Sequence, residues 1–476
     1  MNACITLKTA PLALAALLLS ACSLAPVYER PALPVADGWP AAAGAAATTG
    51  TTAAHEIRWQ DFFRDERLKQ VIGLALEHNR DLRVAILNIE RARALYQVQA
   101  ADRLPGVNAG LSGARQRVPD QLAPDGRGGV ASSYTSGLGV TAFELDLFGR
   151  VRNLSDAALE RFAATEEARR AAHISLVAEV AATYEAMAAD DELLTLSRQT
   201  LASRSESHGR QVQLREQGAS SEFDLRQSES LLEAANIALS QAVRQRALDE
   251  NALTVLTGRA LPTGQRLYPS ALHTRDAMAE LPAGLPSALL AARPDIRRQE
   301  ALLRAANANI GAARAAFFPR ITLTGAFGSS SSELSGLFDS GTRAWSFLPQ
   351  ISLPIFDGGR NRANLGVAKA DRDIAVAQYD KAIQQAFREV ADALAGCGTL
   401  GEELRAVRAQ EGAERVRHDL ARLRYEGGQS SYLEYLDAQR SLFASQQQSI
   451  RIGLAETQNR IALYKALGGG WAAGEL

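Results

Sequence analysis

Two stretches of the chain carry apolar or small residues at helical spacing over an unusual length. From Val151 to about Glu216 there is no proline, and apolar positions recur about every 3.6 residues, as along one stripe of a helix. The stretch from Asn361 to Glu426 repeats this pattern. About 65 residues at 1.5 Å each make a helix of roughly 100 Å, several times the diameter of a globular domain. Such helices must pack along neighbours, so the pattern predicts a long bundle or coiled coil.

Each long helix is expected to turn back sharply into a second helix. Gly218 and the glycines at 427–428 suit the left-handed residue that ends a helix. Ser431 and Glu434 form a capping box, in which the serine accepts from the helix and the glutamate reaches back, and Ser221 begins a weaker version. The sequence therefore predicts two helical hairpins with tight tips.

Four shorter segments alternate apolar and polar residues with the period of two that a strand requires. The clearest begin at Ile321 and Trp345, and a third begins at Val107. Leu138, Val140 and Ala142 mark a fourth less clearly, after the turn at 124–129. A second turn lies at 335–341. Strands of about 10 to 14 residues with one apolar and one polar face are long enough to cross hydrocarbon at a tilt, and a soluble antiparallel sheet is the alternative.

The chain contains this pattern twice, because four blocks of similar sequence recur in the same order at an offset of roughly 210 residues. The blocks pair 81–105 with 295–319, 143–150 with 351–360, 214–218 with 423–427, and 251–258 with 459–468. Each half is expected to read helix, strand, turn, strand, long helix, turn, long helix.

These patterns define the expected organisation of the chain. The regions are a signal peptide at 1–21, a lipid-anchored segment at 22–60, a first repeat at 61–260, a linker or equatorial segment at 261–288, a second repeat at 289–470 and a tail at 471–476. The β-hairpins are expected at 106–147 and 320–356, and the long helical hairpins at 150–258 and 360–467.

The first residues predict export and lipidation. Lys8 precedes an apolar run, Ala10 to Leu19, which is too short to span a bilayer but fits a signal-peptide core. Small residues then lead to Cys22, as in a bacterial lipoprotein cleavage site, so Cys22 is expected to carry a covalent lipid. Ser23 favours the outer membrane by analogy. The alternative is an ordinary signal peptide with an incidental cysteine.

Composition and the absence of known motifs argue against nucleic-acid binding, internal disulfides, metal sites and catalysis. The 476 residues carry a net charge of −1, which offers no basic field for nucleic acid. Beyond Cys4 and Cys22 only Cys397 remains, so there is no internal disulfide framework, and the six scattered histidines predict no metal centre. No HExxH, phosphate-binding loop or GxSxG motif is present, so we expect no catalytic residues, no enzyme activity and no cofactor.

Four strands cannot close a barrel alone, and open strand edges are not tolerated in lipid. A membrane-spanning protomer must therefore share a barrel of 8, 12 or 16 strands with one, two or three further copies. The long helices would extend it as a hollow tube, which predicts a lipid-anchored conduit. The alternative is a structural or adhesive coiled-coil trimer. The alanine-rich stripes with near-3.6 spacing favour straighter helices than that alternative requires.

The chain resembles the outer membrane factors of the TolC superfamily, and most of all the OprM-type (NodT-family) lipoprotein channels of tripartite efflux pumps. The resemblance is strongest at 144–150, 308–319 and 436–443 and covers nearly the whole chain. It implies a mixed, mainly α, duplicated protomer that contributes four strands to a trimeric 12-stranded transmembrane barrel, with coiled-coil helices forming a periplasmic tunnel. It also implies a homotrimer in the outer membrane, with a periplasmic adaptor and an inner-membrane RND transporter as partners.

The resemblance also implies passive export of small molecules such as drugs and antibiotics through a duct that closes at its periplasmic helix tips. Arg424 and Tyr425 occupy the places of an Arg-Tyr pair at the tips of such channels, and Asp224 matches a family aspartate. Ser430 stands where an aspartate is expected, so closure is predicted to depend on side-chain bulk and on Arg424, Tyr425 and nearby Glu426. The alternative is that these residues are ordinary solvated helix ends, with Ser430 and Ser431 serving as N-caps. The tip candidates are Arg215, Asp224, Arg424, Tyr425, Glu426 and Ser430.

Overall fold

The computed structural model describes residues 24–36, 38–39, 56–122, 128–260, 278–279, 281 and 293–470. The predicted signal peptide, Cys22, the tail and nearly all of the linker at 261–288 lie outside these residues. The first repeat comprises α2 (Trp59–Phe62), α3 (Glu66–His78), α4 (Arg80–Ala101), β1 (Val107–Val118), η2 (Asp120–Leu122), β2 (Gly129–Leu145), α5 (Arg150–Glu216) and α6 (Glu222–Thr257). The second comprises α8 (Pro294–Ala315), β3 (Arg320–Ser331), β4 (Arg343–Ser352), α9 (Arg360–Glu426) and α10 (Tyr432–Ala466).

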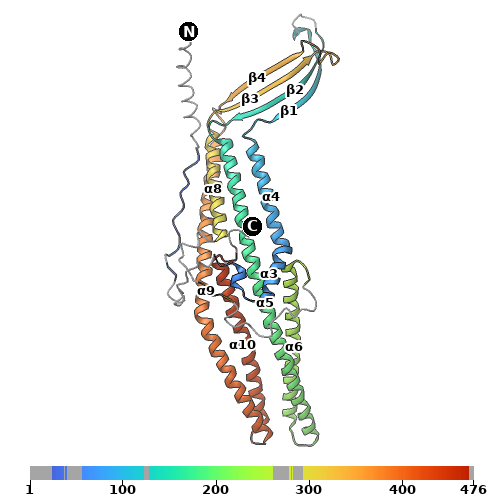
Figure 1. The fold of residues 1–476 in the computed structure, drawn as a ribbon, viewed down its shortest axis with the longest axis vertical. Helices are drawn as coiled ribbons and strands as arrows, with labels where there is room; N and C mark the ends of the chain where they lie inside the picture. Colours follow the sequence, from blue (N-terminus) through green and yellow to red (C-terminus); the bar gives the residue numbers. More distant parts are fainter. Residues whose placement is uncertain are drawn as a thin grey trace. The chain divides into compact units, whose positions relative to one another are not determined.

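The predicted order of elements is confirmed in both halves (Figure 1). α5 and α9 have 67 residues each, while α4 and α8 have 22 residues each. Their equal lengths match what two copies of one structural half require. None of the described helices carries an apolar stretch long enough to cross a membrane.

The chain forms two compact units, and each takes segments from both repeats. The first unit contains 1–32, 88–166 and 298–379, and the second contains 33–87, 167–297 and 380–476. The sheet lies entirely in the first unit, and the helical hairpins made by α5 with α6 and by α9 with α10 end in the second. The boundaries of the compact units therefore differ from the boundaries of the two sequence repeats.

The four strands form one antiparallel sheet in the order β1-β2-β3-β4, so the pairing of β2 with β3 joins the two repeats. β2 has 17 residues, and the prediction of 10 to 14 was too short for it. The pairing of β2 with β3 shifts between Val140 and Phe143, where Ala142 has φ +50° and its N–H donates to Thr324 Oγ1 at 3.1 Å. This β-bulge absorbs an extra residue, which a simple alternation cannot reveal.

The core of the second unit packs α3 against α5, α6 and α10. The predicted stripe on α5 is buried there at Leu176, Val180, Tyr184 and Met187. Because many other stripe positions are small, this aromatic and aliphatic cluster supplies most of the bulky apolar packing.

Candidate functional site

Both helical hairpins end in tight turns with the predicted caps. Gly218 and Gly428 have φ of +72° and +69°, a conformation that glycine adopts without strain. Ser221 accepts from the N–H of Asp224, and Ser431 accepts from the N–H of Glu434. The turns are thus fixed by local backbone chemistry, which brings the candidate residues to the tips.

Three of the candidates make contacts within their own hairpin: Arg215 and Asp224 in the first, and Arg424 in the second. Arg424 Nη1 lies 2.9 Å from Glu434 Oε1, so the glutamate predicted to reach back to its own cap instead pairs with α9. Arg215 lies 3.4 Å from Glu222. The Asp224 carboxylate accepts from the Ser221 hydroxyl at 2.6 Å. The two ion pairs tie each outgoing helix to its own return helix, and the bond between Ser221 and Asp224 closes the start of α6.

Tyr425 forms the clearest contact between the two hairpins. Its hydroxyl accepts from Gln211 Nε2 at 3.1 Å, and Gln211 Oε1 accepts from the Ser220 hydroxyl at 2.7 Å. The ring of Tyr425 stacks on Tyr435 with 5.7 Å between centroids and 2° between planes, and Tyr432 is packed beside them. We call this chain from Ser220 through Gln211 to Tyr425 the tip link.

Glu426 and Ser430 lie next to the tip link. Glu426 Oε1 is 4.0 Å from Arg210 Nη1 of the other hairpin, and both side chains are about half exposed, so this ion pair adds little stability. The Ser430 hydroxyl is buried and makes no hydrogen bond within the described part of the chain. Burial raises the pKa of the nearby Tyr432 hydroxyl above its ordinary value.

Sequence reasoning missed Gln211, Ser220 and the tyrosines of α10. Gln211 and Tyr425 are 214 positions apart, and a glutamine in a helix carries no signal of its partner. The alignment of the two repeats gave one indirect indication of this contact. It places position 216 opposite Tyr425, so the tips of the two hairpins are expected at the same height along the bundle.

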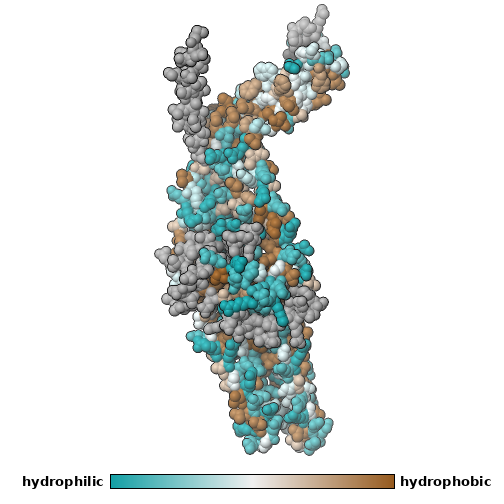
Figure 2. Space-filling model, in the orientation of Figure 1, coloured by the Kyte–Doolittle hydropathy of each residue, from teal (hydrophilic) through white to brown (hydrophobic). Residues whose placement is uncertain are grey.

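The register of the sheet sorts its side chains into two faces, as the alternation predicted. Directly paired residues share a face, so Leu138, Phe327 and Trp345 lie together in one row. Eight large apolar residues of this face are more than half exposed: Val107, Leu111, Val130, Leu138, Phe327, Trp345, Phe347 and Ile351. Figure 2 shows hydrophobic residues gathered on the sheet. An exposed group of large apolar side chains on one face marks a surface that meets a partner or a membrane.

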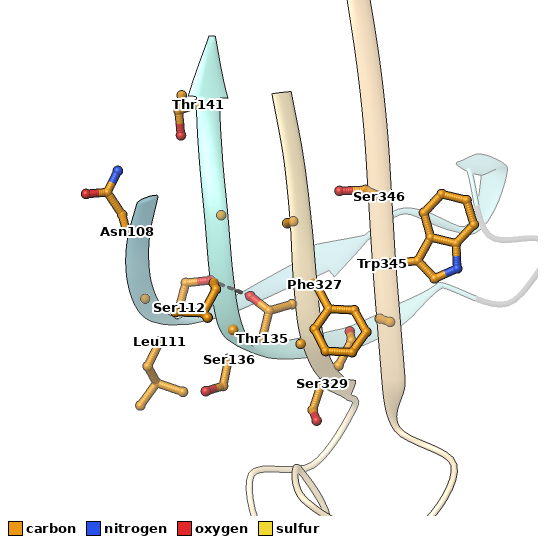
Figure 3. Close-up of a pocket in the computed structure, with 18 residues that line it drawn as sticks. Asn108, Leu111, Ser112, Thr135, Ser136, Thr141, Phe327, Ser329, Trp345 and Ser346 are labelled. Atoms are coloured by element: carbon orange, nitrogen blue, oxygen red, sulfur yellow. Dashed lines mark hydrogen bonds between the residues drawn. The ribbon is translucent and has the colours of Figure 1, made fainter. Parts of the chain in front are cut away.

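The opposite face carries hydroxyl groups, glycines and small residues. The Ser112 and Thr135 hydroxyls lie 2.6 Å apart across β1 and β2 (Figure 3). A hollow of about 490 Å³ follows the curve of the sheet, and its lining takes residues of this face together with Leu111, Leu138, Phe327 and Trp345 of the apolar face. None of the residues that line it is an acid, a base, a cysteine or a histidine. Leu348 is the one large apolar side chain of β4 on this face. The surface suits contact with water rather than chemistry on a bound molecule.

An ion cluster stands where the strands meet the helices. The Glu144 carboxylate accepts from Arg150 Nε and Nη2, both at 2.8 Å, and Arg320 Nε lies 2.6 Å away. Phe148 stacks on Phe318 with 4.8 Å between centroids. Residues of both repeats therefore close this junction, which agrees with the strong motif at 144–150.

The segment that follows Cys22 is held along α8. Arg314 Nη1 donates to Leu24 O at 3.0 Å, Asn307 donates to Pro26 O at 2.7 Å, and Arg30 pairs with Glu300 at 2.8 Å. The segment therefore runs antiparallel to α8, and its first residues lie at the end of α8 that leads into β3. Cys22 itself lies outside the described residues, two positions before Leu24.

Within the described residues, no group of three or more His, Cys, Asp or Glu side chains is placed to hold a metal ion. The functional features are therefore a tip link, a two-faced sheet and a fixed N-terminal segment.

Comparisons with known proteins agree with these features. A family model described as outer membrane efflux protein matches residues 71–259 and 285–469. The outer membrane protein OprJ of Pseudomonas aeruginosa is 49% identical over 469 residues, which cover 97% of this chain and 95% of OprJ. The solvent efflux pump outer membrane protein SrpC of Pseudomonas putida is 47% identical over 463 residues, or 97% of this chain and 98% of SrpC.

A solved structure shares the fold. The open state of the MtrE outer membrane channel of Neisseria gonorrhoeae superposes with a TM-score of 0.85 at 40% identity, over 95% of this chain and 99% of MtrE. The predicted resemblance to TolC-superfamily channels is thereby confirmed, and the chain belongs to the outer membrane efflux protein family.

Proposed function

We propose that the protein is the outer-membrane exit duct of a tripartite efflux pump, and that it moves solutes passively without changing them. The observation that carries this proposal is the two-faced sheet, with large exposed apolar residues on one face and hydroxyl groups on the other. Lipid on one side and water on the other satisfy both faces at once.

Three copies complete the membrane part. β1 and β4 are the outer strands of a four-stranded sheet and present unpaired backbone groups. Such edges are not stable in lipid, so β4 of one copy pairs with β1 of the next. Three sheets then supply twelve strands, and the long helices of the three copies continue the channel as a periplasmic tunnel.

The partners and cargo follow from the relatives. SrpC is named for a solvent efflux pump and ArpC of Pseudomonas putida, 47% identical, for an antibiotic efflux pump. We therefore assign this chain a periplasmic adaptor and an inner-membrane RND transporter as partners, and small organic molecules as cargo. The polar lining of the sheet carries charge only at the pair of Glu144 and Arg320 next to the helices, which supports a duct that selects little, so the pump sets the substrate range.

The helix tips close the duct. The tip link joins the two hairpins of one protomer, so opening by movement of one hairpin against the other must break it. Arg424 stabilises its own hairpin through Glu434 and supports closure by keeping Tyr425 in place.

Cys22 carries the lipid, and the fixed N-terminal segment delivers it to the correct level. The hydrogen bonds from Arg314 and Asn307 hold residues 24–26 at the sheet end of α8. A lipid two residues earlier then reaches the inner surface of the same membrane that the sheet crosses. Besides this covalent lipid the duct needs no cofactor and no metal.

The test combines transport with conductance. Deleting the gene is expected to sensitise cells to solvents, dyes and antibiotics, and the wild-type gene restores tolerance. Purified trimer in a planar bilayer should conduct poorly at rest and well after the tips are opened. A protein that stays monomeric in detergent, or that gives no conductance under any condition, would rule out the duct.

A further inference from the structure

The four strands contain only five charged residues. Two of them lie on one face of the sheet at one end of the strands, and three lie on the other face at the other end. Glu144 and Arg320 lie at the end next to the helices, where they pair with each other at 2.6 Å. Arg115, Arg117 and Arg343 lie at the opposite end, next to the turns between strands. No acidic residue of the strands stands near these three arginines.

The register places the three arginines on the apolar face. Arg115 pairs with Ser132 and Arg117 with Val130, in the same alternating set as Leu111 and Leu138. Arg343 pairs with Ser329, two positions from the pair of Trp345 with Phe327. The pair of Glu144 and Arg320 belongs to the other face. Arginine on the face that meets lipid is unfavourable unless it lies at the boundary of the hydrocarbon.

The distances along the strands put the arginines at that boundary. Eight residues separate Ile351 from Arg343, or about 26 Å along the strand, which becomes about 20 Å along the membrane normal at a tilt of about 40°. Arg115 lies about 10 Å further out by the same count. An apolar band in such proteins is about 25 Å tall, so the three arginines bracket its outer edge.

The arginines are free to bind. All three are exposed, and no ion pair connects them to a carboxylate among the residues that the structure describes. The nearest acids in sequence stand in the turns beyond the strand ends, where Asp120 accepts from the Gly128 N–H at 2.6 Å. Tyr134 and Trp345 are on the same face and suit the polar edge of a membrane.

We propose that Arg115, Arg117 and Arg343 form a binding site for the phosphate groups of an anionic lipid in the outer leaflet. A guanidinium donates two parallel hydrogen bonds to two oxygens of one phosphate, and its positive charge is attracted to a surface that carries many phosphates. The acyl chains of the same lipid cover Trp345, Phe347 and Leu111 below. The site fixes the depth of the sheet in the membrane. This proposal rests on the proposed function, because it requires the sheet to cross the outer membrane.

The arrangement also predicts that the site is shared. Arg343 is on β4, and Arg115 and Arg117 are on β1, at opposite edges of one sheet. When β4 of one copy pairs with β1 of the next, Arg343 of the first copy and Arg115 and Arg117 of the second lie at the same boundary between the two copies. Three equivalent boundaries then give three lipid sites per trimer.

The experiment measures lipid binding to purified trimer by native mass spectrometry. The probe is lipid A with both phosphates, compared with lipid A from which the phosphates have been removed. The test protein combines Arg115→Gln, Arg117→Gln and Arg343→Gln. The matched control removes three exposed arginines of α4 and the turn after it, by Arg83→Gln, Arg91→Gln and Arg103→Gln. All proteins are also assayed for trimer content and for channel conductance in a planar bilayer.

The expected result is tight, phosphate-dependent binding to the wild type and to the control. The test protein should bind on the order of 100-fold more weakly, about fivefold for each arginine lost, while it remains trimeric and conducts normally. Its residual affinity should match that of the wild type for phosphate-free lipid A.

Two results would overturn the site. Equal binding of phosphorylated lipid A to the test protein and the wild type excludes a role for these arginines. Complete displacement of lipid A by inorganic phosphate would show a simple anion site in place of a lipid site. If instead the wild type forms no channel at all, the duct itself fails, and that outcome is distinguished by the conductance assay.

Discussion

The tip link offers the sharpest test of how the duct is held closed. Tyr425→Phe removes one hydroxyl and keeps the ring that stacks on Tyr435. Gln211 is 2% exposed, so its Nε2 loses its hydrogen-bond partner in a buried position. Loss of such a bond costs at least about 1 kcal/mol in each protomer.

The size of the effect depends on how the protomers open. If all three tips open together, about 3 kcal/mol shifts the balance between closed and open channel by roughly 100-fold, since 1.4 kcal/mol is tenfold. If each tip opens alone, the shift is about fivefold per protomer. Single-channel recordings of wild type and Tyr425→Phe in a planar bilayer give the open probability directly.

Two controls locate the effect. Gln211→Leu should raise the open probability by a similar factor, and the double variant should add little, because both changes remove the same bond. Arg424→Gln breaks a contact inside one hairpin and should act less strongly than Tyr425→Phe. An unchanged open probability in both Tyr425→Phe and Gln211→Leu would refute the reasoning and place the closing contacts elsewhere.

Three further predictions concern stability. Burial raises the pKa of Glu185 to about 7 from an ordinary value of 4.5, so the folded state loses stability as pH rises between these values. Glu185→Gln should therefore raise the melting temperature at pH 8, with a gain that shrinks by pH 5; a gain that is the same at both pH values would contradict this. Glu300→Ala removes the shared partner of Tyr28, Arg30 and Arg304 and should speed proteolysis of the N-terminal segment, measured by limited digestion; an unchanged rate of digestion would contradict this. Gly258→Ala places a methyl group 2.3 Å from His78 O at a φ of +68° and should cost more than about 2 kcal/mol in chemical denaturation; a loss under 0.5 kcal/mol would show that the turn can relax.

Much of the fold could be predicted because its signals are local and long. The helices α5 and α9 begin within one residue of the predicted starts, since a proline-free stripe of more than sixty residues has few alternatives. The caps at Ser221 and Ser431 also depend only on neighbouring residues. The faces of β1, β3 and β4, and of β2 as far as Val140, follow from the period of two and required no knowledge of their partners.

The parts that could not be predicted depend on contacts between distant segments. The bulge near Ala142 appears only when β3 is placed beside β2, and the Gln211 contact appears only when the two tips meet. Glu434 had the sequence of a capping residue, but Arg424 offers its carboxylate a charged partner that the cap cannot match. The roles assigned to Arg215, Asp224, Glu426 and Ser430 at the tips remain predictions for the conductance assay.

The equal lengths of α5 and α9 limit how such a protein can evolve. Both helices have 67 residues, and Gln211 meets Tyr425 only because the two hairpins reach the same level. A deletion of two turns from one helix would shift its tip by about 10 Å and leave the other without a counterpart. Related proteins with a shorter or longer tunnel must therefore change both repeats by the same number of residues, so that the helices that correspond to α5 and α9 keep equal lengths.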